Sequence, residues 1–90
     1  MKPIKITVSR PKNVKAAIAY ARAEAKRNGV YFDGNEICGQ GQGYGFKASY
    51  TINASSIELT ILDKPFLVPA SMVQDKIKKF CAEYLRKESA

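Results

Sequence analysis

Three segments of the chain alternate apolar with polar residues, and a period of two is typical of half-buried β-strands. In the first segment the apolar positions are Ile4, Ile6 and Val8. In the second they are Tyr44, Phe46, Ala48, Tyr50 and Ile52, and in the third Ile57, Leu59 and Ile61. We expect these rows to face the core and Lys47, Ser49 and Thr51 to face water. Residues 53–56 form a turn signal, so the last two strands should pair as a meander.

A short hairpin is expected before the long strand. Residues 30–32 are β-prone, Asp33-Gly34-Asn35 is a turn signal, and residues 36–38 return the chain. Glycine then recurs at every second position from Gly39 to Gly45. Phosphate-binding glycine motifs have a different spacing and precede a helix, whereas a strand follows here. We interpret the run as the twisted start of a strand or a loop, with a ligand cradle as the less favoured alternative.

Two segments have helical periodicity. The first helix is expected over residues 11–28, with Ser9 as its cap, Pro11 in its first turn and Asn28-Gly29 at its end. The second is expected over residues 71–87, begun by a capping box of Ser71 and Gln74. Its buried stripe comprises Val73, Ile77, Phe80, Cys81 and Tyr84, and we place Phe80 at the centre of the core. Pro65 and Pro69 bracket an apolar connector that we expect to lie over the core.

These elements predict one α+β domain spanning residues 1–90. The expected architecture is a two-layer sandwich with the order β-α-β-β-β-α. Its sheet would be mainly antiparallel and four-stranded. Because the outward residues of the clear strands are polar, both helices should cover a single face.

Composition narrows the chemistry. The chain has no histidine, which removes the commonest general base and zinc ligand, and 46% of its residues are hydrophobic, as in a packed domain. Cys38 and Cys81 form no C-x-x-C motif, no stretch is apolar enough to span a membrane, and the first residues read as a strand instead of a signal peptide. Cys81 is expected to pack in the core, and Cys38 has no histidine to activate it. We therefore expect a cytoplasmic protein that is not an enzyme and has no metal or cofactor.

The chain is basic, with 15 Lys and Arg against 8 Asp and Glu and a formal charge of +7. At 100° per residue, four cations of the first helix fall within an arc of about 80° opposite its apolar stripe. They are Lys12, Lys15, Arg22 and Lys26. This basic ridge suits a phosphate backbone, anionic lipid headgroups or an acidic partner, and the alternative is an ordinary solvated face.

The order of motifs resembles a known family. Gly29-Val30, Asp33-Gly34-Asn35, Gly43-Tyr44-Gly45-Phe46, residues 57–61, Pro65-Phe66-Leu67 and an amphipathic C-terminal helix follow one another over about residues 4–86. The chain is similar in this order to the polyhydroxyalkanoic acid system family, small bacterial proteins found with polyester-granule genes. The resemblance implies no catalytic residues, because the family has none established. It implies a bacterial binding or accessory protein whose partner is a polyester granule surface or another protein. The alternative function is nucleic-acid binding through the basic ridge.

Overall fold

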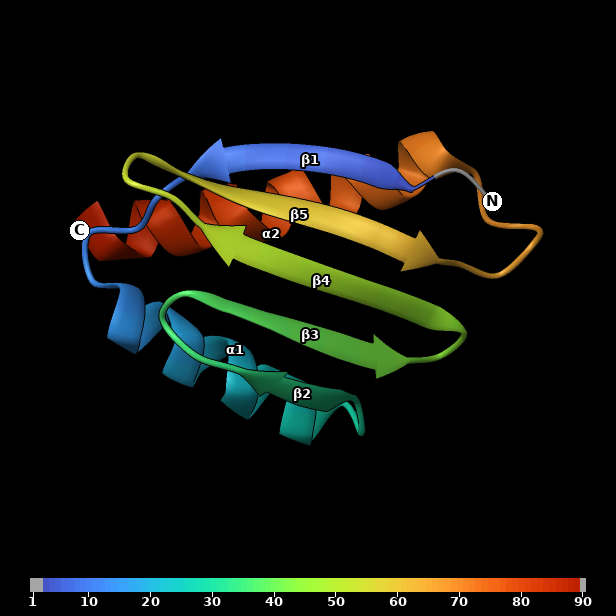
Figure 1. Cartoon of the computed structure of the whole chain (residues 1–90), viewed down its shortest axis with the longest axis horizontal. Coiled ribbons are helices and arrows are strands. Elements are labelled where there is room, and N and C mark those ends of the chain that lie inside the picture. The colour runs from blue at the N-terminus through green and yellow to red at the C-terminus, as the bar shows by residue number, and fades with distance from the viewer. Residues whose placement is uncertain (1–2, 90) are drawn as a thin grey trace.

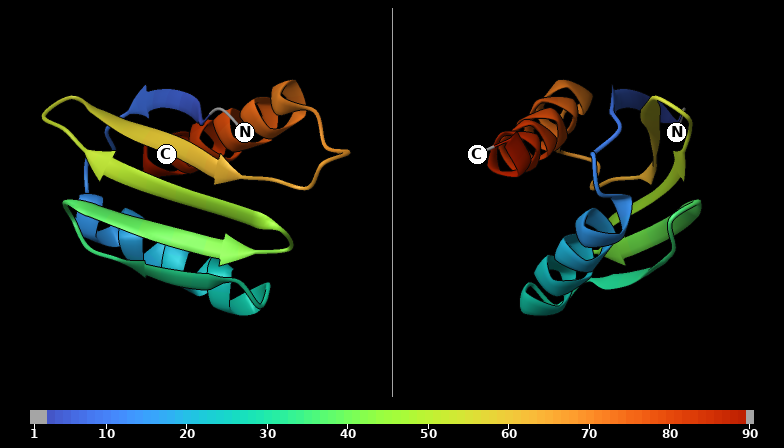
Figure 2. Two further views of the ribbon diagram at one scale, coloured as in Figure 1. Left: turned by 45° about the vertical axis from the view of Figure 1, so that its right-hand side comes forward. Right: turned by 90° about the vertical axis from the view of Figure 1, so that its left-hand side faces the viewer.

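Five antiparallel strands form one sheet, and two helices pack on one of its faces (Figures 1 and 2). The computed structural model describes residues 3–89. The elements are β1 (Ile4–Ser9), α1 (Val14–Arg27), β2 (Tyr31–Gly34), β3 (Cys38–Gly43), β4 (Phe46–Ile52), β5 (Ser56–Asp63) and α2 (Ala70–Ser89). The strand order across the sheet is β1-β5-β4-β3-β2. The predicted α+β class is confirmed.

The prediction of four strands in the order β-α-β-β-β-α is wrong by one strand. The glycine run is itself β3, which pairs with β2 on one side and β4 on the other. Tyr44 and Gly45 both have positive φ, at 54° and 82°, and make the two-residue turn that joins β3 to β4. Tyr44 therefore belongs to a turn and not to the long strand.

The register of β4 confirms the predicted facing of its other residues. Ala48 pairs with Ile61, and Tyr50 pairs with Leu59, which places all four side chains on the helix-covered face. Lys47 and Thr51 are exposed on the opposite face. The alternation of β4 with β5 and β1 thus builds one continuous apolar face.

Both helix starts differ from their predicted positions. The side chain of Asn13, not Ser9, caps α1 by accepting a hydrogen bond from the Ala16 amide at 3.0 Å. Helix α2 already includes Ser71, because it begins at Ala70 directly after Pro69. The chain therefore caps α1 with Asn13, a residue type preferred at this position, and begins α2 directly after Pro69.

The packed core is small and lies mainly under α2. It consists of Ile4, Ile6, Ile61 and Val73, surrounded by half-buried apolar neighbours such as Leu59 and Ile77. On α1 only Val14 is buried among the described residues. The middle of the sheet, between the two helices, is consequently less filled than its β1 side.

Candidate functional site

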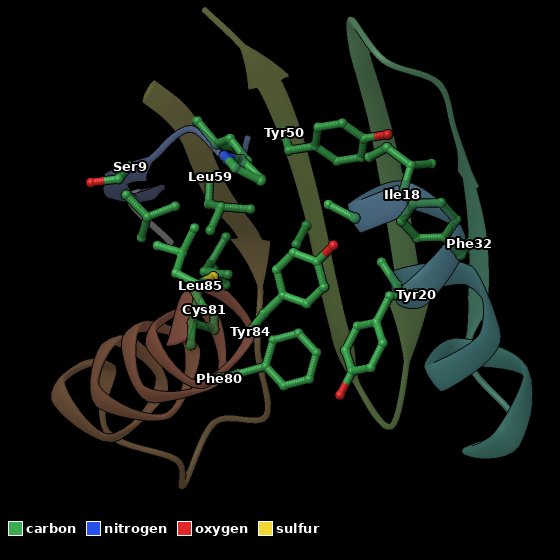
Figure 3. Close-up of a pocket in the computed structure, with 18 residues that line it drawn as sticks. Ser9, Ile18, Tyr20, Phe32, Tyr50, Leu59, Phe80, Cys81, Tyr84 and Leu85 are labelled. Carbon is green, nitrogen blue, oxygen red and sulfur yellow. The ribbon is translucent and has the colours of Figure 1, made fainter. Parts of the chain in front are cut away.

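An apolar cavity of about 230 Å³ lies between the two helices and above the middle strands (Figure 3). Helix α1 contributes Ile18 and Tyr20 to one side, and α2 contributes Phe80, Cys81, Tyr84 and Leu85 to the other. The strands contribute a floor of further apolar side chains, among them Ala48, Tyr50, Leu59 and Ile61. Almost no polar surface lines this space. It can therefore hold an apolar group but offers no set of convergent polar groups for catalysis.

The glycines Gly34 and Gly39 leave room for the ring of Tyr50, which lines this cavity. A Cβ atom on Gly39 would lie 2.5 Å from Cε1 of Tyr50 and 2.6 Å from Cα of Gly34, so only glycine fits beneath the tyrosine ring. The Tyr50 hydroxyl donates a hydrogen bond to the Asn35 carbonyl at 2.7 Å, and the ring stacks on Phe32 with centroids 6.0 Å apart. The space at Gly39 is thus occupied by an aromatic ring, which gives no support to the ligand-cradle alternative.

Three aromatic rings contact one another at the boundary between the helices. The Tyr20 ring centroid lies 5.8 Å from that of Phe80 and 5.1 Å from that of Tyr84. Lys87 places its ammonium 5.7 Å from the centroid of Tyr20. Phe80 is 43% exposed, so its predicted place at the centre of the core is wrong. It lines the cavity and contacts Tyr20 of α1 at its boundary.

Glu88 connects the end of α2 to the start of α1. Its two carboxylate oxygens accept hydrogen bonds from the backbone amides of Lys12 and Asn13, at 2.8 and 3.1 Å. Backbone amides at a helix start favour a negative partner. This contact links the two helices at one end of the sheet, and no pattern in the sequence indicated it.

The residues of the basic ridge remain at the surface but do not form one uniform row. Lys15 and Lys26 are exposed on α1, while Lys12 is exposed just before the helix begins. Arg22 donates to the Gly34 carbonyl at 2.9 Å, and its guanidinium lies 5.9 Å from the centroid of Phe32. Arg22 thus ties α1 to β2. Within residues 3–89, the side chains of Lys12, Lys15 and Lys26 make no hydrogen bond, ion pair or ring contact.

An exposed apolar turn follows β5. The Val68 amide donates to the Pro65 carbonyl at 3.1 Å, and this β-turn presents Phe66 and Leu67, which are 93% and 87% exposed. Val68 packs against the core, and Pro65 lies beside Gly45. The prediction that the connector lies over the core is therefore wrong for Phe66 and Leu67 and correct only for Val68. The β3–β4 turn lies at the same end of the sheet (Figure 1), and its Tyr44 is 74% exposed.

The two free cysteines differ in environment. Burial raises the pKa of the Cys81 thiol above its ordinary value, in agreement with a packing role. Cys38 is exposed beside a shallow polar hollow on the outer face of the sheet, near Asp33 and Gln40. Within residues 3–89, no cluster of three His, Cys, Asp or Glu side chains is placed to bind a metal ion.

Helix α2 is 20 residues long, yet neither it nor α1 has a window apolar enough to cross a membrane, as judged over the described part of the chain. Comparison with known proteins found no matching family model, no matching curated protein and no matching solved structure.

Proposed function

We propose that this protein is a non-catalytic binding protein that attaches to an apolar surface through the turn carrying Phe66 and Leu67. The observation that carries the proposal is the near-complete exposure of these two side chains on a turn whose flanking residues are fixed. Val68 anchors the turn in the core, and Pro65 packs beside the β3–β4 turn. Fixing the turn in advance lowers the entropy lost when it binds.

The chemistry of the surroundings supports an apolar surface as the partner. The β3–β4 turn packs beside Pro65, and its exposed Tyr44 extends the apolar area there; exposed apolar groups that gather in one place are typical of interaction sites. The main cavity lacks the polar groups that a catalytic pocket needs. Because the order of motifs resembles that of the polyhydroxyalkanoic acid system family, we propose that the apolar surface is a polyester granule in the cytoplasm of a bacterium.

Sedimentation with polyhydroxybutyrate particles tests this proposal. Transferring a Phe or Leu side chain out of water is worth about 1.5–3 kcal/mol each, so replacing both by Ser should weaken binding by at least about tenfold. A matched control is Ile37→Ser, because Ile37 is 69% exposed and belongs to the β2–β3 turn, which lies at the opposite end of the sheet (Figure 1). We expect the control to bind like the wild type. Equal binding of the Phe66→Ser/Leu67→Ser variant and the wild type would refute the proposal.

Nucleic-acid binding is the second candidate, and the exposure of Lys12, Lys15 and Lys26 favours it. Each phosphate neutralised on duplex DNA adds about −0.9 to the slope of log affinity against log salt, so contacts from the three lysines predict about −2.7. The variant in which Lys12, Lys15 and Lys26 are all alanine should lose this dependence, and it keeps Arg22, which ties α1 to β2. Absence of wild-type binding at low salt would remove this candidate, while attachment through Phe66 and Leu67 should persist or strengthen as salt rises.

A further inference from the structure

We propose that the cavity between α1 and α2 binds a single unbranched alkyl chain that carries an anionic head, such as a medium-chain carboxylate. This site is separate from the exposed turn at Phe66 and Leu67, and the inference does not depend on attachment to a granule. It rests on the size, the lining, the length and the charged mouth of the cavity.

The volume and the lining select an apolar guest. An engineered apolar cavity of about 150 Å³ stays dry and binds benzene, and the cavity here is larger, at about 230 Å³. A buried water needs at least two polar partners, and this lining offers almost none. Water therefore fills the inner part of this space poorly, and a hydrocarbon can replace it without breaking hydrogen bonds.

The length of the cavity favours a chain over a ring. Its lining runs along β5 from Ile57 to Ile61, a rise of about 13 Å at 3.3 Å per residue. On α2 it runs from Ile77 to Leu85, about 12 Å at 1.5 Å per residue. In a zigzag of carbon–carbon bonds of about 1.5 Å, each carbon advances the chain by about 1.3 Å, so about ten carbons would fill such a length.

The mouth of the cavity supplies a positive charge for the head. The Lys87 ammonium lies 5.7 Å from the centroid of Tyr20, the ring that also contacts Phe80 and Tyr84. Phe80 is 43% exposed, so this aromatic boundary meets solvent. A carboxylate that remains in water at this boundary can approach Lys87, and the net charge of +7 increases the local concentration of anions.

Titration with decanoate below the concentration at which it forms micelles tests the site. Binding can be followed by calorimetry and by amide chemical shifts, and we expect saturation at one decanoate per protein. Ala21 lines the cavity, whereas Ala23, two residues away on the same helix, is exposed and does not. Ala21→Leu should weaken binding at least tenfold, and Ala23→Leu should not change it. Ala48→Leu fills the same space from the sheet and serves if Ala21→Leu fails to fold.

The head is tested separately by comparing decanoate with decanol. Lys87→Gln should weaken decanoate binding several-fold and leave decanol unchanged, and Lys79→Gln on the exposed side of α2 is the control. An equal effect of Lys87→Gln on both ligands, or none on decanoate, would overturn the anionic head. Tighter binding of naphthalene than of decanoate would overturn the alkyl chain. Absence of saturable binding, or equal binding by Ala21→Leu and Ala23→Leu, would overturn the site itself.

Discussion

Replacing Gly39 by alanine should destabilise the protein strongly, because the side chain of Tyr50 occupies the space that a Cβ atom would need. The added carbon would lie 2.5 Å from the Tyr50 ring and 2.6 Å from the Cα atom of Gly34. Neither neighbour can retreat easily. The Tyr50 ring is stacked on Phe32 and hydrogen-bonded to the Asn35 carbonyl, and Gly34 is paired with Gly39 in the sheet.

The magnitude follows from two opposing effects. Overpacking of this kind lowers the free energy of unfolding by about 1–3 kcal/mol, while replacing a strand glycine by alanine raises it by about 0.5–1 kcal/mol. Gly41 is the matched control, since it lies in the same strand, faces the same side, and a Cβ there would meet only the Tyr31 carbonyl oxygen, at 3.4 Å. Gly41→Ala should therefore be neutral or slightly stabilising. The two variants should differ by about 2 kcal/mol in free energy of unfolding.

Thermal unfolding followed by circular dichroism measures this difference. One kcal/mol corresponds to about 4–8 °C in a domain of this size, so Gly39→Ala should melt about 8–16 °C below Gly41→Ala. Urea unfolding at 25 °C gives the free energies directly. If the two variants melt together, the glycine run does not serve to seat the Tyr50 ring, and the account of this cavity wall is wrong.

Three further outcomes follow from named contacts. Phe80→Ala should cost about 2 kcal/mol because the ring is half exposed, whereas Ile61→Ala at 2% exposure should cost about 2–5 kcal/mol, as urea unfolding of each would show. At pH 8, iodoacetamide should modify the exposed Cys38 faster than Cys81, since burial raises the pKa of Cys81 and lowers its thiolate fraction; equal rates by mass spectrometry would contradict this. Glu88→Gln should lower the free energy of unfolding by about 1 kcal/mol through weaker bonds to the Lys12 and Asn13 amides, and an unchanged urea midpoint would contradict this.

The elements that could be predicted are those in which apolar residues recur at regular spacing. Strands β1 and β4, and β5 as far as Ile61, alternate apolar with polar residues, and their facing matched the structure. Strand β3 escaped prediction as a separate strand because three of its six residues are glycine, which leaves one face without side chains. The apolar surface beside β3 comes from the neighbouring strands, because β2 carries the ring of Phe32 and β4 carries the ring of Tyr50.

The basic ridge could be located from helical geometry, but the role of Arg22 could not. The wheel places Arg22 among solvated cations, whereas the fold brings the Gly34 carbonyl within 2.9 Å of its guanidinium. The exposure of Phe66 and Leu67 escaped for a related reason. An apolar segment between two prolines is compatible with burial or with a turn, and the hydrogen bond from Val68 to Pro65 decides for the turn.

The cavity could not be predicted from periodicity, because it depends on the volumes of the side chains on facing elements. The stripe of α1 contains Ala17 and Ala21, which are small, and the sheet below contributes Ala48. Small residues let a helix approach closely, yet α1 is held over β2 by Arg22, and α2 is held over β1 by Val73. The helices therefore stand over opposite sides of the sheet while the residues between them are too small to fill the gap. A larger residue at Ala21 or Ala48 would fill part of this space, so alanine at both positions leaves room for the proposed ligand and makes the packing between the helices less dense.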